Sequence, residues 1–549
     1  QTIHWIHDVI PNQLVLQKFE RSKTWSYLTS VHFSKDVVLK AYKLGKALQR
    51  KNNDELRKIH EEKWLKLWKK GRIEMKGVSD NATRLTKAIT SSLYNLLSSL
   101  PDFSNENNLF ESQWKQKDLM ESYLFTGLSP SGLSWGDRKD HKNMQAYRGH
   151  LFWDQETWMY PPLLMLHQSS AQLMLQARLR TMYTAGENAK IEGFVGMKYP
   201  WESALTGIEV SPDRECGIRE IHINGDISLA VLQYLRVTDH NLTCQGNVPK
   251  LIIGIADYWL SRSVWNNSCL RFEISCVMPP DEYSRCVNNS AYTNVVARIS
   301  LKLAFEVAEC LKLPNSTVYE NTFKRMYVPF DGELNYHPEY DGYVLGKIVK
   351  QADVVLLGFP LMYNMLPDVR RRDLEIYENV TSVKGPAMSD AMFTVGWLEV
   401  HEPDRARRSF EKMFDHVTGD FQVWTEVKGG HGAPNFITGM GGYLQSIIFG
   451  YFGIRIYRDK LLINPELPTD ISSMALYGLD YKNCSLDIFV GDRNEMVIKW
   501  SGDVGCSRLL IVSPTERLRL SGSRKMTISK SSLYIRVIHE RGTNDACFP

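Results

Sequence analysis

The feature that most constrains the fold is a change of hydrophobic pattern near residue 457. Between about residues 78 and 455, apolar residues recur at helical spacing in runs separated by loops rich in glycine, proline and aromatic residues. After residue 457, short segments with β-branched residues and alternating polarity follow one another, with turn residues between them. The pattern predicts a mainly α protein in which a large helical domain is followed by a small antiparallel β domain.

The central part contains a series of apolar runs, each long enough for several helical turns. No strand-like segment is recognised between them, and no fixed repeat period is visible, which disfavours a regular solenoid. We therefore expect an all-α toroid of the (α/α)6 barrel type, with the aromatic-rich loops at one mouth. The expected helices cover residues 82–100, 155–167, 170–190, 220–237, 248–264, 290–311, 350–358, 367–379, 386–398, 403–415 and 437–451.

Both ends of the chain differ from this central part. Residues 1–33 hold short extended stretches and are too few for an independent domain, and two helical runs follow after Ser34. At the other end, turn residues such as Gly478 and Gly491 separate the alternating segments, which is typical of antiparallel strands. The expected strands cover residues 461–464, 474–477, 485–490, 495–500, 508–512, 517–520 and 532–538.

Charge and cysteine content narrow the functional classes. The 66 basic and 62 acidic residues leave a net charge of +4, too even for a nucleic-acid-binding surface, and no membrane span is expected. The nine cysteines include no Cys-x-x-Cys pair and are expected to be mostly reduced, which favours a cytoplasmic protein. Seven glycosylation sequons are weak evidence for the opposite, at Asn81, Asn241, Asn266, Asn288, Asn315, Asn379 and Asn483.

Three segments place carboxylates among aromatic and glycine residues: 148–158, 278–294 and 421–432. Aromatic rings stack on the C–H face of a sugar ring, while charged and amide side chains bind its hydroxyls. Cleavage of a glycosidic bond needs two carboxyl groups, one protonated to assist the leaving oxygen and one ionised. The three segments therefore indicate a sugar site.

Local pattern alone also allows simpler interpretations of the carboxylates. Glu282 fits an exposed residue in the first turn of a helix, where it would offset the helix dipole. Glu426 fits one half of a surface ion pair with Lys428, and Asp154 fits an N-cap for a helix that begins near Gln155. The histidines are too widely separated for a metal-binding motif, so neither a metal nor a cofactor is expected.

Six short motifs make the chain similar to glycoside hydrolase family 65 over about residues 35–457. They occur in order at 149–156 (GHLFWDQE), 199–203 (YPWES), 222–226 (HINGD), 280–283 (PDEY), 292–294 (YTN) and 350–353 (KQAD). The resemblance implies a remnant of an N-terminal β-sandwich at 1–33, a helical linker at 34–77, an (α/α)6 catalytic barrel at 78–456 and a β domain at 457–549. Most of the sandwich is expected to be missing.

The resemblance also implies roles for individual residues. Glu282 would be the general acid, and Glu426 would activate water on the opposite face of the sugar, giving inversion. Trp153 and Asp154 would hold the glucosyl unit, with Lys350 and Gln351 binding its hydroxyls. The stretch 430–442 has no serine pair to hold a phosphate, which favours the hydrolytic branch of the family.

Within that branch, the pattern is most similar to enzymes that release glucose from α-1,2-glucosyl-galactosyl-hydroxylysine, a collagen-type glycan. A glycosylated hydroxylysine or a small glucoside is thus the expected partner, with no nucleic acid and no membrane. Asp281, Glu202 and Glu209 are candidates to bind the lysyl ammonium. The alternatives are an α,α-trehalase, an α-glucosyl disaccharide phosphorylase and a non-catalytic glycan-binding protein, and the oligomeric state is left open.

Overall fold

The structure is a computed structural model whose backbone divides into two compact units. It describes residues 2–32, 34–51, 53–100, 126–133, 147–238, 246–314, 316–491, 495–502, 505–513, 517–520, 524–529 and 535–539. Among these, the residues up to Gly71 belong to the first unit and those from Arg72 onward to the second. Every site residue expected from the sequence lies in the second unit.

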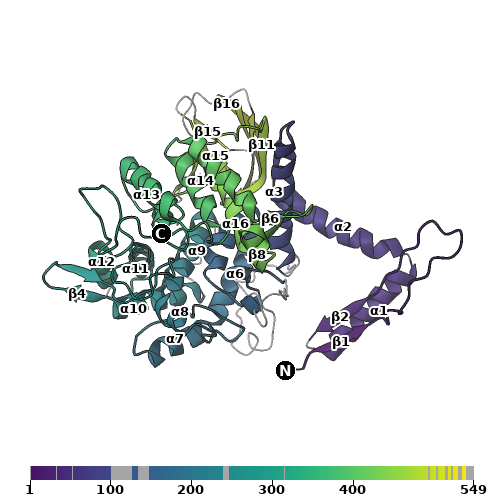
Figure 1. Cartoon of the computed structure of the whole chain (residues 1–549), viewed down its shortest axis with the longest axis horizontal. Coiled ribbons are helices and arrows are strands. Elements are labelled where there is room, and N and C mark those ends of the chain that lie inside the picture. The colour runs from purple at the N-terminus through teal and green to yellow at the C-terminus, as the bar shows by residue number, and fades with distance from the viewer. Residues whose placement is uncertain are drawn as a thin grey trace. The chain divides into compact units, whose positions relative to one another are not determined.

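The first unit is a hairpin with two helices. Strands β1 (His4–His7) and β2 (Thr29–His32) pair antiparallel, and Figure 1 shows them lying alongside helix α1 (Lys35–Lys51). Helix α2 (Asn53–Lys70) follows, with acidic residues in its first turn and lysines in its last. That distribution of charge offsets the dipole of the helix.

The second unit is mainly helical, which confirms the predicted fold class at that level. Helix α3 (Asp80–Ser98) begins after Ser79, whose side chain accepts a hydrogen bond from the backbone N–H of Ala82 as an N-cap. The helices that follow are η1 (Tyr147–Gly149), η2 (Gln155–Met159), α5 (Tyr160–Leu166), α6 (Gln168–Arg180), α7 (Met182–Ile191), α8 (Arg214–Arg219), α9 (Ile223–Val237), α10 (Val248–Arg262), α11 (Ala291–Leu311), α12 (Ser316–Arg325), η4 (Val354–Leu357), α13 (Pro367–Val380), α14 (Ser389–Glu399), α15 (Pro403–Lys412), η5 (Met413–His416), η6 (Lys428–Gly430), α16 (Ile437–Gln445), η7 (Ser446–Tyr451) and η8 (Cys506–Arg508).

Two expectations about the helical part are wrong. The helix expected over 350–358 is only a short 3-10 turn, η4, because residues 350–353 form a loop that is hydrogen-bonded to Pro280 and Asp281 and not within itself. Strands do occur between the helices, in two small antiparallel sheets. They are β4 (Val264–Asn266), β5 (Arg271–Glu273), β6 (Val417–Thr418), β7 (Val423–Val427) and β8 (His431–Pro434).

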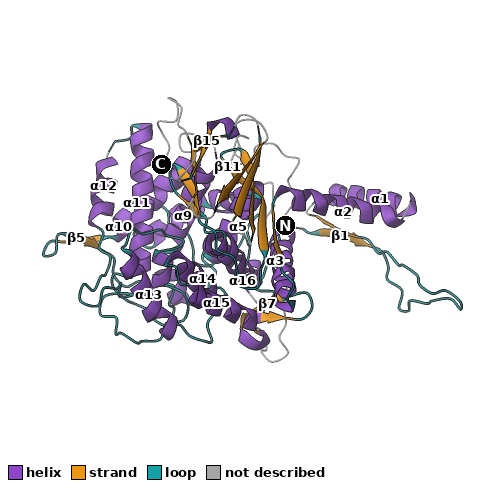
Figure 2. Ribbon diagram, turned by 90° about the horizontal axis from the view of Figure 1, so that it is seen from above, coloured by secondary structure: helices purple, strands orange, loops and turns teal. Residues whose placement is uncertain are grey.

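The C-terminal part forms two five-stranded sheets in which all neighbouring strands are antiparallel, as predicted. Their orders are β15-β14-β17-β10-β9 and β16-β13-β12-β11-β3, and Figure 2 shows the strands gathered together. The edge strand β3 (Arg72–Lys76) comes from the start of the unit. The others are β9 (Arg455–Ile456), β10 (Lys460–Ile463), β11 (Ser473–Tyr481), β12 (Cys484–Gly491), β13 (Glu495–Ser501), β14 (Leu509–Val512), β15 (Arg517–Arg519), β16 (Arg524–Ser529) and β17 (Ile535–His539).

The expectation of mostly reduced cysteines is wrong for four of the nine. Cys276 is bonded to Cys286, and Cys484 to Cys506. The pairs escape a search for Cys-x-x-Cys because folding, not sequence spacing, brings the sulfurs together. The cytoplasmic expectation thereby loses its main argument, since disulfides persist chiefly in oxidising compartments.

The remaining cysteines and two of the sequons are either free thiols or lie outside the described residues. Cys216, Cys269 and Cys310 are free thiols, whereas Cys244 and Cys547 lie outside the described residues. The sequons at Asn241 and Asn315 also lie outside them. None of the helices in the described part of the chain combines the length and the apolar character that a bilayer crossing requires.

Candidate active site

The loop between β5 and α11 carries Glu282, and the buried Asp281 beside it fixes the loop. Asp281 accepts hydrogen bonds from the backbone N–H of Lys350 (2.6 Å) and from the Ser284 hydroxyl (3.0 Å). Its own backbone N–H donates to the carboxylate of Asp353 (3.0 Å). Asp281 is fully buried where it ties its loop to residues 350–353, so a lysyl ammonium of a bound ligand cannot reach it.

Glu282 forms an ion pair with Lys350. The Lys350 ammonium lies 2.6 Å from Oε1 of Glu282, and the two side chains remain 29% and 30% exposed. Burial alone would lower the pKa of Lys350, but the nearby carboxylates of Glu282, Glu220 and Glu426 raise it above its usual value. Glu282 is not in the first turn of a helix, so that simpler interpretation is wrong.

Glu426 lies on strand β7 with both carboxylate oxygens bonded. Oε1 accepts a hydrogen bond from the Tyr147 hydroxyl (2.8 Å), and Oε2 accepts one from the backbone N–H of Ala433 (2.9 Å). Strand β8 can approach closely enough for this second bond because Gly432 has no side chain: a Cβ there would lie 2.6 Å from the Cβ of Glu426. Lys428 pairs with Asp415 rather than with Glu426, so the surface ion pair considered from the sequence is wrong.

Asp154 lies in the electrostatic field of both glutamates. Burial raises its pKa to about 7; the hydrogen bond from the Thr438 hydroxyl (2.7 Å) opposes that shift, whereas Glu426 and Glu282 add to it. The side chain makes no helix-capping hydrogen bond, so the N-cap interpretation is also wrong. Asp154 is instead a buried carboxyl that is bonded to Thr438 in the first turn of helix α16.

The other two expected binding residues are buried next to these groups. Trp153 is 2% exposed and packs edge-on against His222, with ring centroids 4.9 Å apart, and against Tyr292. Gln351 is 3% exposed, and its side-chain amide donates to the backbone carbonyl of Pro280 (2.6 Å). All six predicted site residues are therefore linked to one region by contacts or by mutual electrostatic effects.

Sequence reasoning missed Tyr147 and Thr438, which orient the two carboxylates. Tyr147 directly precedes the segment 148–158, and Thr438 lies in the loop inspected for a phosphate site. Burial, followed by Glu426 and Asp154, raises the pKa of Tyr147 well above its usual value, so its hydroxyl remains a donor at neutral pH. Neither residue carries a sequence signal of its own, since both contacts are tertiary.

A buried carboxyl group beside Glu282 was also missed. Glu220 is 1% exposed, and its two oxygens have no hydrogen-bond partner among the described residues. Cys216, Glu220 and Glu282 each place one sulfur or carboxylate oxygen that could bind a metal within 4.8 Å of the other two. Burial and the charge of Glu282 raise the pKa of Glu220, which favours its neutral form. Because Lys350 already supplies positive charge at Glu282, we assign this group to the surroundings of the acid rather than to a metal centre.

Two further glutamates considered from the sequence occupy the loop after Trp201. Oε1 of Glu202 lies 2.6 Å from Nδ1 of His150. Burial raises the pKa of Glu202, and His150 opposes that shift. Glu209 accepts hydrogen bonds from the backbone N–H groups of Trp201 and Ser211. Glu209 therefore shapes the loop, whereas Glu202 is buried and paired with His150.

Known proteins resemble the chain in both sequence and fold. The profile of the glycosyl hydrolase family 65 central catalytic domain matches residues 143–347. A protein-glucosylgalactosylhydroxylysine glucosidase of Danio rerio is 39% identical over 88% of this chain and 71% of its own length. The Gallus gallus protein of the same name is 41% identical over 88% of the chain and 66% of its own length.

A solved structure shows the same fold at low sequence identity. It is described as a kojibiose phosphorylase from the human microbiome, and it superimposes with a TM-score of 0.73 at 17% identity. The match covers 91% of this chain and 67% of that one. The fold around the two glutamates is thus one that is known from experiment.

Proposed function

The chain belongs to glycosyl hydrolase family 65, and we propose that it is an inverting glycosidase that releases glucose from α-1,2-glucosyl-galactosyl-hydroxylysine. The names of its relatives support this substrate. The observation that carries the mechanism is a pair of glutamates from distant parts of the chain that are each held in place, Glu282 by Lys350 (2.6 Å) and Glu426 by Tyr147 (2.8 Å). The chain spans about two thirds to seven tenths of these relatives, 66% and 71% of their length.

In the proposed reaction, Glu282 protonates the leaving oxygen and Glu426 removes a proton from the attacking water. The hydroxyl of Tyr147 and the N–H of Ala433 each bind one oxygen of Glu426, which fixes the plane of the carboxylate. A carboxylate has about four lone-pair positions, so a water can still donate to it. Inversion calls for carboxyl groups about 6.5–9.5 Å apart, with the water between one of them and the anomeric carbon.

Four residues are proposed to bind the glucosyl unit. Asp154, with a pKa of about 7, can both accept and donate hydrogen bonds to sugar hydroxyls. A sugar hydroxyl that binds the Lys350 ammonium would draw this ammonium away from Glu282. The Glu282 carboxyl would then be able to protonate the leaving oxygen. Gln351 donates through its amide to Pro280, so its carbonyl oxygen is the group left for a sugar hydroxyl. Trp153 supplies an apolar wall.

We also propose the finer architecture expected from the sequence. In it, residues 78–456 form an (α/α)6 barrel, 34–77 a linker that is helical up to Lys70 and ends in strand β3, 1–33 part of an N-terminal β domain and 457–549 the C-terminal β domain. The run of helices from α3 to α16 and the fold shared with the phosphorylase structure support this arrangement. The loops that carry Glu282 and Lys350, together with strand β7 that carries Glu426, then lie at one mouth of the barrel.

The test is incubation of the purified chain with glucosylgalactosylhydroxylysine, kojibiose and trehalose, with and without phosphate. We expect glucose from the first substrate, and proton NMR should detect the β-anomer before mutarotation, since inversion at an α-linkage produces it. First-formed α-glucose would contradict inversion. Phosphate-dependent glucose 1-phosphate would favour a phosphorylase, and glucose from trehalose alone would favour a trehalase.

A further inference from the structure

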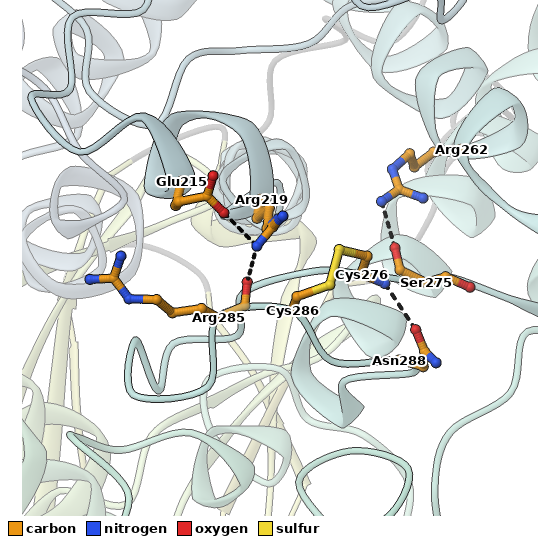
Figure 3. Close-up of a disulfide and its surroundings, with 8 residues drawn as sticks. All are labelled: Glu215, Arg219, Arg262, Ser275, Cys276, Arg285, Cys286 and Asn288. Carbon is orange, nitrogen blue, oxygen red and sulfur yellow. Dashed lines mark hydrogen bonds and ion pairs between the residues drawn. A yellow bond between two sulfur atoms is a disulfide. The ribbon is translucent and has the colours of Figure 1, made fainter.

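A disulfide closes the loop that carries Glu282. Cys276 and Cys286 are bonded at a sequence separation of 10, as Figure 3 shows, and Glu282 lies between them. Directly after each cysteine, Val277 and Val287 exchange two backbone hydrogen bonds, each 2.9 Å long. The base of the loop is therefore held by one covalent bond and one pair of hydrogen bonds.

The two limbs of this loop are anchored very differently. The limb that leads to Glu282 is buried: Met278 donates its N–H to the carbonyl of Arg219, and Pro280 accepts from Gln351. Asp281 adds the bonds described above. This limb is fixed to the body of the protein by several contacts that do not involve sulfur.

The limb that returns from Glu282 lies at the surface. Tyr283 is 54% exposed, and both Arg285 and Cys286 are exposed. The backbone carbonyl of Arg285 accepts from Arg219 (3.2 Å), and its guanidinium pairs with Asp213 (3.0 Å) where both side chains are well exposed (Figure 3 shows the Arg219 contact). Exposed ion pairs of this kind contribute little. Beyond Ser284, the covalent bond to Cys276 is thus the strongest restraint on the returning limb.

We propose that the Cys276–Cys286 disulfide is a positioning element for Glu282 and that its reduction slows cleavage of the glycosidic bond. The inference rests on the proposed role of Glu282 as general acid. An acid contributes only while it lies within hydrogen-bond reach of the leaving oxygen, and a displacement of about 1 Å lowers rates by up to roughly 10²-fold. Because Asp281 still anchors one limb, the expected loss in kcat is smaller, about 10-fold.

The exposed position of Cys286 gives thiol reagents access to the bond. A dithiol such as dithiothreitol attacks one sulfur, and its second thiol then completes the exchange. The reagent is oxidised to its cyclic disulfide. Its two electrons and two protons are transferred to Cys276 and Cys286, which become free thiols. Removal of the reductant and addition of oxidised glutathione reverses the change.

The experiment compares two double variants of the full chain. Cys276→Ser/Cys286→Ser removes the loop disulfide, and Cys484→Ser/Cys506→Ser removes the bond in the C-terminal β domain as a matched control. Each is assayed on glucosylgalactosylhydroxylysine, whose sugar alkoxide needs a proton to leave, and on 4-nitrophenyl α-glucoside, whose nitrophenolate does not. Circular dichroism confirms that each variant is folded at the assay temperature.

For the loop variant, we expect kcat on glucosylgalactosylhydroxylysine to fall about 10-fold with little change in KM, and kcat on the nitrophenyl glucoside to stay within about 2-fold. Dithiothreitol should reproduce this pattern in the wild type and add nothing in the loop variant. The control variant should keep both rates. Equal losses on the two substrates, or no loss at all, would overturn the positioning role while leaving the enzyme assignment intact. A wild type that releases no glucose from any substrate would instead overturn the proposed function.

Discussion

The hydroxyl of Tyr147 donates to Oε1 of Glu426 across 2.8 Å, although the two residues come from opposite ends of the helical part of the chain. The same phenol ring packs edge-on against Phe152 and lies near Phe436. Aromatic packing fixes the ring, and the ring fixes the carboxylate. The geometry of the proposed base is therefore set through Tyr147, which lies outside every motif that sequence analysis identified.

Removal of this hydroxyl should slow the reaction without weakening binding. In Tyr147→Phe, the ring remains but Glu426 loses one of its two orienting hydrogen bonds, so we expect kcat to fall about 10-fold with KM nearly unchanged. Steady-state kinetics on the preferred substrate measure both constants. Tyr183→Phe, at a tyrosine that is 73% exposed, is the matched control. A change confined to KM would contradict the positioning of the base.

Loss of the acid should depend on the leaving group. Glu282→Gln keeps the shape of the side chain but has no proton to give, so turnover of glucosylgalactosylhydroxylysine should fall by roughly 10²–10⁴-fold. Hydrolysis of 4-nitrophenyl α-glucoside should fall far less. Binding of the glycan, measured by calorimetry, should persist. Equal rates for wild type and variant on the natural substrate would remove Glu282 from the mechanism.

Loss of the base should be repaired by a nucleophile that needs no base. Glu426→Gln should lose activity to a similar extent as the acid variant, by roughly 10²–10⁴-fold. Azide can attack the anomeric carbon directly from the face that water normally uses, so its addition should yield β-glucosyl azide. NMR and mass spectrometry of the product measure this. Formation of the α-azide, or full activity without azide, would contradict the assigned role.

The raised pKa of Asp154 predicts a pH dependence of stability. The folded-state pKa of about 7 lies above the unfolded value of 3.8, so the protonated carboxyl favours the folded state below about pH 4. That contribution is lost as the pH rises to about 7, and the shift corresponds to about 4 kcal/mol. Asp154→Asn cannot ionise, so the stability of the variant relative to wild type should increase over this window. Urea unfolding at several pH values measures it.

Asp420→Asn, at an exposed position, is the control for that series. A constant difference between Asp154→Asn and wild type from pH 4 to 7 would show that Asp154 keeps an ordinary environment. The opposite trend would be a fall in the stability of the variant relative to wild type as the pH rises. It would indicate that the fold stabilises the ionised carboxylate.

A methyl group at Gly432 should displace Glu426. Gly432→Ala places a Cβ 2.6 Å from that of Glu426 on a backbone with φ of 76°, so we expect a loss of activity and about 1–3 kcal/mol of stability. Gly430→Ala is the matched control: its φ is 80°, but a Cβ there meets nothing within 4 Å. Melting temperatures and kcat separate the two effects. Equal losses in both variants would mean that backbone strain alone is responsible.

The helices were predictable where one apolar face recurs over several turns. The run expected over 290–311 is helix α11, and that over 367–379 is α13. The same reasoning failed at 350–358, because Lys350 and Gln351 donate hydrogen bonds to the loop of Glu282. It also failed at β7, a strand too short for its alternation to stand out among helices.

The candidate site was predictable only through the order of its motifs. Spacing along the chain could not reveal that Glu282 and Glu426 act on the same lysine, since that depends on how the loops fold back. Contacts such as Thr438 with Asp154, and the buried Glu220 beside Glu282, involve residue types that are common everywhere. The disulfide between Cys276 and Cys286 was missed for the same reason.

Strand β3, which precedes the first long helix of the second unit, completes the edge of a sheet whose other strands all lie after residue 472. This makes the terminal β region a poor candidate for exchange between genes. A recombination event that replaced everything after residue 457 would have to supply a partner for Ile73 and Met75, which are buried against it. The helical part and the terminal β region are thereby coupled, so a substitution in β3 calls for a matching substitution in β11.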